Sequence, residues 1–154
     1  MSHDPFSSLT IIRGKLSYAN PTGRRIIIHA DRWQLAKLRW RGTASDEREF
    51  GFELEHPLAH GDLVWENDYG YYLIQQVPEA VLVITSHEIT VTAALAWSIG
   101  NLHQPLQVNG HELIVPDDPA VRQLCQQQEI AFAAEHRVFQ PIRSVVGHTH
   151  HHHH

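Results

Sequence analysis

The spacing of apolar positions has a two-residue period in the first half of the chain. Residues 49–54 place two phenylalanines and a leucine at alternate positions, as in a half-buried strand. Residues 9–13 and 24–29 are rich in β-branched side chains and flank an Asn-Pro-Thr-Gly turn, and residues 34–41 alternate more loosely. Short strands at such intervals predict a small all-β domain over residues 1–77.

The period becomes helical after an apolar strand at residues 80–85. Ser86 is expected to cap a helix that continues to about Ile99, and Gly100 is expected to end it. The apolar stripe of this helix is expected to consist of Ile89, Ala93, Ala96 and Trp97.

A hairpin and a second helix follow. Asn109-Gly110 predicts a tight turn between two short strands. Asp117 or Asp118 can cap a helix that has Pro119 in its first turn, and a last strand is expected over residues 130–139. The resulting β-α-β-β-α-β order predicts a ferredoxin-like domain over residues 78–146, so the fold class of the whole chain is α+β.

Composition narrows the function classes. The chain has 154 residues, of which 42% are hydrophobic, and a formal net charge of −5. This charge argues against a nucleic-acid partner, and no apolar run reaches the roughly 20 residues that span a bilayer. The N-terminus does not read as a secretory signal, and the single cysteine excludes an internal disulfide. We therefore expect a cytoplasmic protein with no membrane partner.

Histidine is unusually frequent. Fourteen residues are histidine, and six of them lie in the last seven positions: His148, His150, His151, His152, His153 and His154. The tail at residues 147–154 is either native or an expression tag, and the sequence leaves both interpretations open. In both cases it is a tract that can bind metal.

His103 is the strongest candidate ligand in the domain body. It lies in the segment Gly-Asn-Leu-His-Gln-Pro-Leu-Gln, between the first predicted helix and a predicted strand. Imidazole is a common ligand of late first-row metals, although one imidazole alone makes a poor site. A capping or surface role is the alternative for His103. His111, across the Asn109-Gly110 turn, is either an accessory ligand or a solvated strand residue.

Catalytic motifs are not apparent. The sequence has no nucleophile elbow, no phosphate-binding glycine loop and no pair of histidines with a carboxylate at helical spacing. Asp117 and Asp118 are better explained by helix capping than by acid–base catalysis. We therefore expect a protein that is not an enzyme.

Several segments together resemble one known family. They are residues 99–107 around His103, residues 39–42, residues 50–54, residues 60–64, the junction at residues 77–79 and the His-rich terminus at residues 147–150. In order and spacing they are similar to the UreE family of urease accessory proteins, which are nickel metallochaperones.

The resemblance implies a function and a site. The N-terminal domain would handle protein partners, and the C-terminal domain would bind metal and form a homodimer. His103 of each subunit would bind Ni(II), because a twofold axis supplies the second imidazole. Zn(II) and Cu(II) are possible competitors. The tail residues His148, His150, His151 and His152 can complete the coordination, and the implied partners are the urease accessory GTPase and the urease apoprotein assembly complex.

Two departures from the family pattern limit the resemblance. Leu102 occupies the position of the family's arginine, and residues 116–119 lack the extra histidines that some members carry. The alternative function is a protein-interaction module of urease maturation whose metal binding comes only from the His-rich tail.

Overall fold

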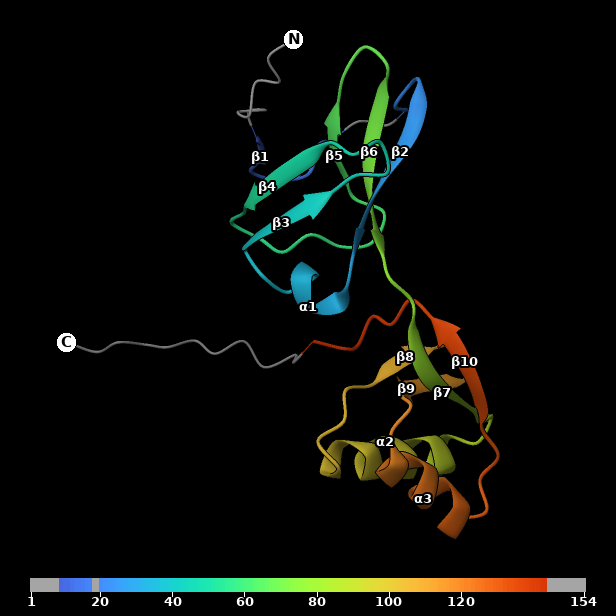
Figure 1. Cartoon of the computed structure of the whole chain (residues 1–154). Coiled ribbons are helices and arrows are strands. Elements are labelled where there is room, and N and C mark those ends of the chain that lie inside the picture. Colours follow the sequence, from blue (N-terminus) through green and yellow to red (C-terminus); the bar gives the residue numbers. More distant parts are fainter. Residues whose placement is uncertain (1–8, 18–19, 144–154) are drawn as a thin grey trace, which may run out of the picture. The chain divides into compact units, whose positions relative to one another are not determined.

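The computed structural model describes residues 9–17 and 20–143 (Figure 1). The chain is a mixed α+β protein with two structural units, Met1–Val77 and Pro78–His154. Within the described part of the chain, no helix is long and apolar enough to cross a membrane.

The N-terminal unit contains two three-stranded sheets. One has the order β1-β4-β3 and the other β2-β6-β5. Strands β1 and β4 are parallel, as are β2 and β6, so the segments on either side of the Asn-Pro-Thr-Gly turn belong to different sheets. The elements are β1 (Thr10–Ile12), β2 (Arg24–Ala30), α1 (Arg32–Leu35), β3 (Arg39–Thr43), β4 (Glu49–Glu53), β5 (Leu63–Glu66) and β6 (Gly70–Gln76).

The short helix α1 corrects the expectation of an all-β domain. Asp31 accepts a hydrogen bond from the Gln34 N–H at 2.7 Å, and the Gln34 side chain accepts one from the Asp31 N–H at 3.0 Å. This reciprocal capping box satisfies backbone donors that a helix start leaves unpaired. The loose alternation at residues 34–41 therefore contains a helical turn before β3 begins.

Aromatic side chains fill the core of this unit. Trp40 stacks on Phe52 with 3.9 Å between ring centroids. Phe50 lies edge-on to Trp65 at 5.7 Å and to Tyr72 at 5.2 Å. The contacts of Phe50 join the two sheets, because β4 belongs to one sheet and β5 and β6 to the other.

Gly70 of β6 lies close against the backbone of β2. A Cβ atom at this position would lie 2.1 Å from the Arg24 carbonyl oxygen, a backbone atom that cannot move without disturbing the pairing. We expect Gly70→Ala to lower the free energy of unfolding by about 2–3 kcal/mol, measured by urea unfolding. Gly14→Ala is the control, since nothing lies within 4 Å of its added Cβ. Equal stability of the two variants would contradict this account of the packing.

The C-terminal unit is a four-stranded antiparallel sheet with two helices. The strand order is β10-β7-β9-β8. Figure 1 shows α2 and α3 on one face of this sheet. The elements are β7 (Glu79–Thr85), α2 (Ile89–Asn101), β8 (Gln107–Asn109), β9 (Glu112–Pro116), α3 (Pro119–Gln127) and β10 (Ala133–Arg137). The last strand is shorter than expected from the sequence.

The two faces of this sheet are covered differently. Leu82 and Ile84 of β7 pack in one buried cluster with Leu95 and Ile99 of α2. Phe139 belongs to a second cluster, formed with side chains of β7 and β9 that alternate with those of the first. The segment after β10 therefore covers the face that the helices leave open.

Helix α2 differs from the prediction at both ends and in the face that it buries. It begins after Glu88 instead of Ser86, and it continues through Gly100 to Asn101. It buries Leu95 and Ile99, whereas Ile89 and Trp97 of the expected stripe are 84% and 71% exposed. An apolar stripe is thus left outside the core of the unit.

Helix α3 resolves the choice between two capping residues. Asp118 is the N-cap and accepts a hydrogen bond from the Ala120 N–H at 2.8 Å. Asp117 instead forms an ion pair with Arg122 at 2.6 Å, and hydrogen bonds from this guanidinium lower the pKa of the carboxyl group. The capping prediction is therefore confirmed for Asp118, whereas Asp117 forms an ion pair instead.

Candidate metal centre

His103 terminates helix α2 in a left-handed backbone conformation. Its φ is 56°, and its N–H donates to the Gly100 carbonyl at 3.0 Å. The next N–H, of Gln104, donates to the Ile99 carbonyl at 3.3 Å. These two bonds form a Schellman motif, in which the left-handed position is usually glycine. The helix therefore ends at Asn101, and its left-handed terminating residue is His103, three residues after the expected glycine.

This conformation is costly for a side chain with a Cβ atom. The left-handed region costs an L-residue other than glycine roughly 1–2 kcal/mol. Backbone strain of this kind concentrates at functional sites, where the surrounding structure maintains it. Because the backbone at His103 is held in this conformation, the Cα–Cβ bond has a fixed direction. The exposed His103 imidazole therefore projects from a defined position beyond the end of the helix.

The electrostatic surroundings of His103 favour a cation. The C-terminal end of a helix carries partial negative charge from its aligned peptide dipoles. The sequence has no lysine or arginine between Arg48 and Arg122, so the whole of α2 and the turn after it lack cationic side chains of these types. Residues 78–154 contain three arginines and seven carboxylates, which gives a formal net charge of −4 with histidine neutral.

The chain leaving the domain is attached close to this turn. The Gln140 N–H donates to the Gln107 side chain at 2.8 Å, and the Ile142 N–H donates to the Leu106 carbonyl at 2.7 Å. Leu106 follows His103 by three residues. The predicted tail ligands His148, His150, His151 and His152 lie outside the described residues. His148 follows Ile142 by six positions, a reach of up to about 20 Å for an extended chain.

The described part of the chain does not bring together three or more metal-binding side chains. Across residues 9–17 and 20–143, no group of three or more His, Cys, Asp or Glu side chains is close enough to hold an ion. The thiol of Cys125 is buried, and burial raises its pKa, so it offers no thiolate ligand. A metal site at His103 would therefore need further ligands from outside this set.

An exposed apolar surface adjoins His103 on α2 and α3. It carries Trp97, which is 71% exposed, and Leu102, which is 37% exposed and immediately precedes His103. A groove of about 320 Å³ runs between the helices and contains no charged side chain. We call this region the α2–α3 surface; its groove is lined by Trp97, Ser98, Asn101, Leu102, Ala120, Gln123, Leu124 and Gln127.

His111 does not lie beside His103. It is exposed at the start of the return strand, and its ring contacts that of His87, with 4.4 Å between centroids. His87 precedes α2 and His103 follows it. No short spacing in the sequence relates His87 to another histidine. The two rings meet because β7 pairs with β9, which brings Thr85 opposite Glu112.

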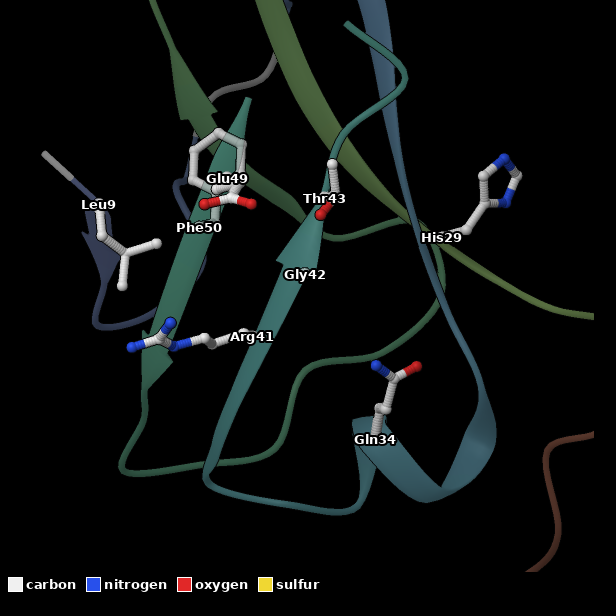
Figure 2. A pocket seen from close by; sticks show the side chains of 8 residues that line it. All are labelled: Leu9, His29, Gln34, Arg41, Gly42, Thr43, Glu49 and Phe50. Atoms are coloured by element: carbon white, nitrogen blue, oxygen red, sulfur yellow. The ribbon is translucent and has the colours of Figure 1, made fainter. Parts of the chain in front are cut away.

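The N-terminal unit has a separate hollow with mixed polarity. Its volume is about 340 Å³, and Figure 2 shows Arg41 extending from β3 toward β4, with Glu49 at the start of β4. Arg41 and Glu49 provide opposite charges, and Leu9 and Phe50 provide apolar walls. This chemistry suits a peptide segment better than a metal ion. The remaining lining residues are His29, Gln34, Gly42 and Thr43.

Comparison with known proteins identifies the family. Residues 79–154 match the family described as UreE urease accessory protein, C-terminal domain. The urease accessory protein UreE of Geobacillus kaustophilus (strain HTA426) is 31% identical to this chain over 132 residues, covering 84% of this chain and 88% of that protein. The UreE protein of Bacillus sp. (strain TB-90) is 30% identical over 132 residues, with the same coverage.

The match thus extends well beyond the C-terminal unit, and the chain belongs to the UreE family of urease accessory proteins. These relatives are named as accessory proteins and not as the enzyme urease.

Proposed function

We propose that this protein is a nickel metallochaperone of urease maturation. It binds Ni(II) as cargo between the His103 residues of two subunits and delivers the ion for assembly of the urease active site. The observation that carries the proposal is the left-handed conformation of His103, an exposed imidazole at a backbone position that favours glycine. Family membership supports a role of the chain in urease maturation, because the relatives are urease accessory proteins.

The two units have different roles in this proposal. The C-terminal unit is a ferredoxin-like domain for metal binding and dimerisation, supported by its β-α-β-β-α-β element order and its antiparallel sheet. The N-terminal unit meets protein partners, namely the urease accessory GTPase and the urease apoprotein complex, and the hollow beside Arg41 offers a place for a peptide. The protein acts in the cytoplasm.

Dimerisation is the step that completes the metal site. The α2–α3 surface exposes the apolar side chains of Trp97 and Leu102, has no charged side chain in its groove and is continuous with the His103 turn through Leu102. Exposed apolar patches of this kind mark association sites. A second copy of the chain on this surface, related by a twofold axis, brings the two His103 turns toward each other.

Coordination by two imidazoles leaves open positions on the ion. Ni(II) accepts nitrogen donors and completes a square or octahedral arrangement with water or oxygen. Histidines of the tail can occupy some of these positions, because the chain is attached at Leu106 before the tail begins. An ion held in this way is captured but accessible, so another protein can take it. Zn(II) and Cu(II) compete for the same donors.

The competing function is an interaction module of urease maturation that binds metal only through its tail. The absence of a three-ligand cluster in residues 9–17 and 20–143 favours this alternative, since the densest run of histidines is the tail itself.

Removal of the tail separates the two functions. We expect protein that ends before Gly147 to retain tight binding of about one Ni(II) per dimer, because His103 of both subunits remains. Calorimetric titration measures the stoichiometry and affinity. Complete loss of tight binding in the shortened protein would favour the interaction module over the carrier.

A further inference from the structure

A pair of exposed histidines lies at the end of the C-terminal unit opposite to His103. The rings of His87 and His111 are 4.4 Å apart between centroids, with 45° between their planes. His87 lies between β7 and α2, and His111 lies in the turn between β8 and β9. The two residues are 24 positions apart in the sequence, and the fold brings their rings into contact.

The backbone supports this pairing independently of the side chains. Strands β7 and β9 are in register up to Thr85 and Glu112, and the Ser86 N–H donates to the His111 carbonyl at 3.0 Å. The Ser86 hydroxyl in turn accepts a hydrogen bond from the Glu88 N–H at 3.3 Å. Ser86 and Glu88, the residues on both sides of His87, are thus hydrogen-bonded. The bond from Ser86 holds His111 beside the end of β7.

The spacing of the rings suits a shared metal ion. A metal–imidazole bond is about 2.0–2.1 Å long, which places each ring centroid roughly 3.2 Å from the ion. Two centroids 4.4 Å apart then subtend about 90° at the ion, the angle between adjacent ligands in square or octahedral coordination. Two protonated rings at the same spacing would repel each other.

We propose that His87 and His111 form a second metal site, in each subunit, for a late first-row divalent ion. The two imidazoles are adjacent ligands, and water completes the coordination. This site goes beyond the proposed dimer centre, because both of its ligands come from one chain. It is also separate from that centre: the 13 residues of α2 between His87 and His103 span about 20 Å.

Imidazole NMR signals of protein that ends before Gly147 provide the test, because the His-rich tail would otherwise take up the probe. Cu(II) is the probe because copper binds most tightly in the Irving–Williams order. We expect substoichiometric Cu(II) to broaden the ring signals of His87 and His111 together. In His111→Ala, the Cu(II) concentration needed to broaden His87 should rise about tenfold or more, and His87→Ala should have the reciprocal effect.

His136→Ala is the matched control, since His136 is an exposed histidine on β10 of the same unit. This variant should leave the Cu(II)-induced broadening of the His87 and His111 ring signals unchanged. If the His87 ring signal broadens at the same Cu(II) concentration in the wild type and in His111→Ala, the two histidines do not form a shared site and each ring binds copper alone. The His103 signal is read in the same spectra, so failure of the dimer centre and failure of this site are distinguishable.

Discussion

Replacing His103 with glycine is expected to weaken Ni(II) binding by at least roughly 100-fold without lowering the free energy of unfolding. Glycine removes the imidazole but adopts the left-handed conformation at no steric cost, so the end of α2 is preserved. Because the strain is relieved, stability should stay the same or rise by up to about 1 kcal/mol. Calorimetry on protein that ends before Gly147 measures affinity, and urea unfolding measures stability.

The chain offers a matched control for this substitution in Glu129. Helix α3 ends with the same motif: Glu129 has φ 54°, its N–H donates to the Gln126 carbonyl, and the Ile130 N–H donates to the Cys125 carbonyl. Glu129→Gly should therefore affect stability as His103→Gly does while leaving Ni(II) affinity unchanged. Equal Ni(II) affinity in wild type and His103→Gly would show that His103 is not a ligand.

A charge placed on the α2–α3 surface should separate the subunits. We expect Trp97→Asp to raise the dimer dissociation constant by roughly 100-fold or more. A tryptophan that becomes buried in a subunit interface is a typical hot spot, and burial of a carboxylate at the same place has a high desolvation cost. Trp97 is 71% exposed in the protomer, so the substitution should leave the protomer folded. Sedimentation equilibrium measures association, and Ni(II) affinity should fall with it.

Trp33→Asp is the control for this experiment. Trp33 is also a tryptophan on a helix and is 65% exposed, but it lies on α1 of the N-terminal unit. It should leave the subunit equilibrium unchanged. If Trp97→Asp and the wild type associate equally well, the α2–α3 surface is not the dimer interface and another occupant must be sought.

Local signals in the sequence predicted many elements of the C-terminal unit. The Asn109-Gly110 turn, the Asp-Pro start of α3 and the apolar run of β7 each act within a few residues, and the structure has all three. The end of α2 was misplaced for a physical reason. Gly100 was expected to stop the helix, but helical hydrogen bonding tolerates glycine, and the left-handed position falls on His103.

Long-range pairing could not be derived in the same way. The parallel pairing of β2 with β6 joins segments more than 40 residues apart, and a turn motif carries no information about it. The same limit concealed the contact of His87 with His111, which depends on the register of β7 and β9. The stripe on α2 was identified as apolar, but periodicity alone does not tell whether such a stripe meets the core or a partner.

The attachment of Gln140 and Ile142 beside Leu106 has a consequence for any affinity measured on this chain. A ligand tethered a few residues from a site has an effective local concentration in the millimolar range, whatever its bulk concentration. In the proposed nickel site, histidines placed after residue 146 would therefore raise the apparent nickel affinity of the His103 turn, irrespective of their origin. A purification tag at this end would then act as part of the proposed metal centre, whereas one at the N-terminus would lack this tether.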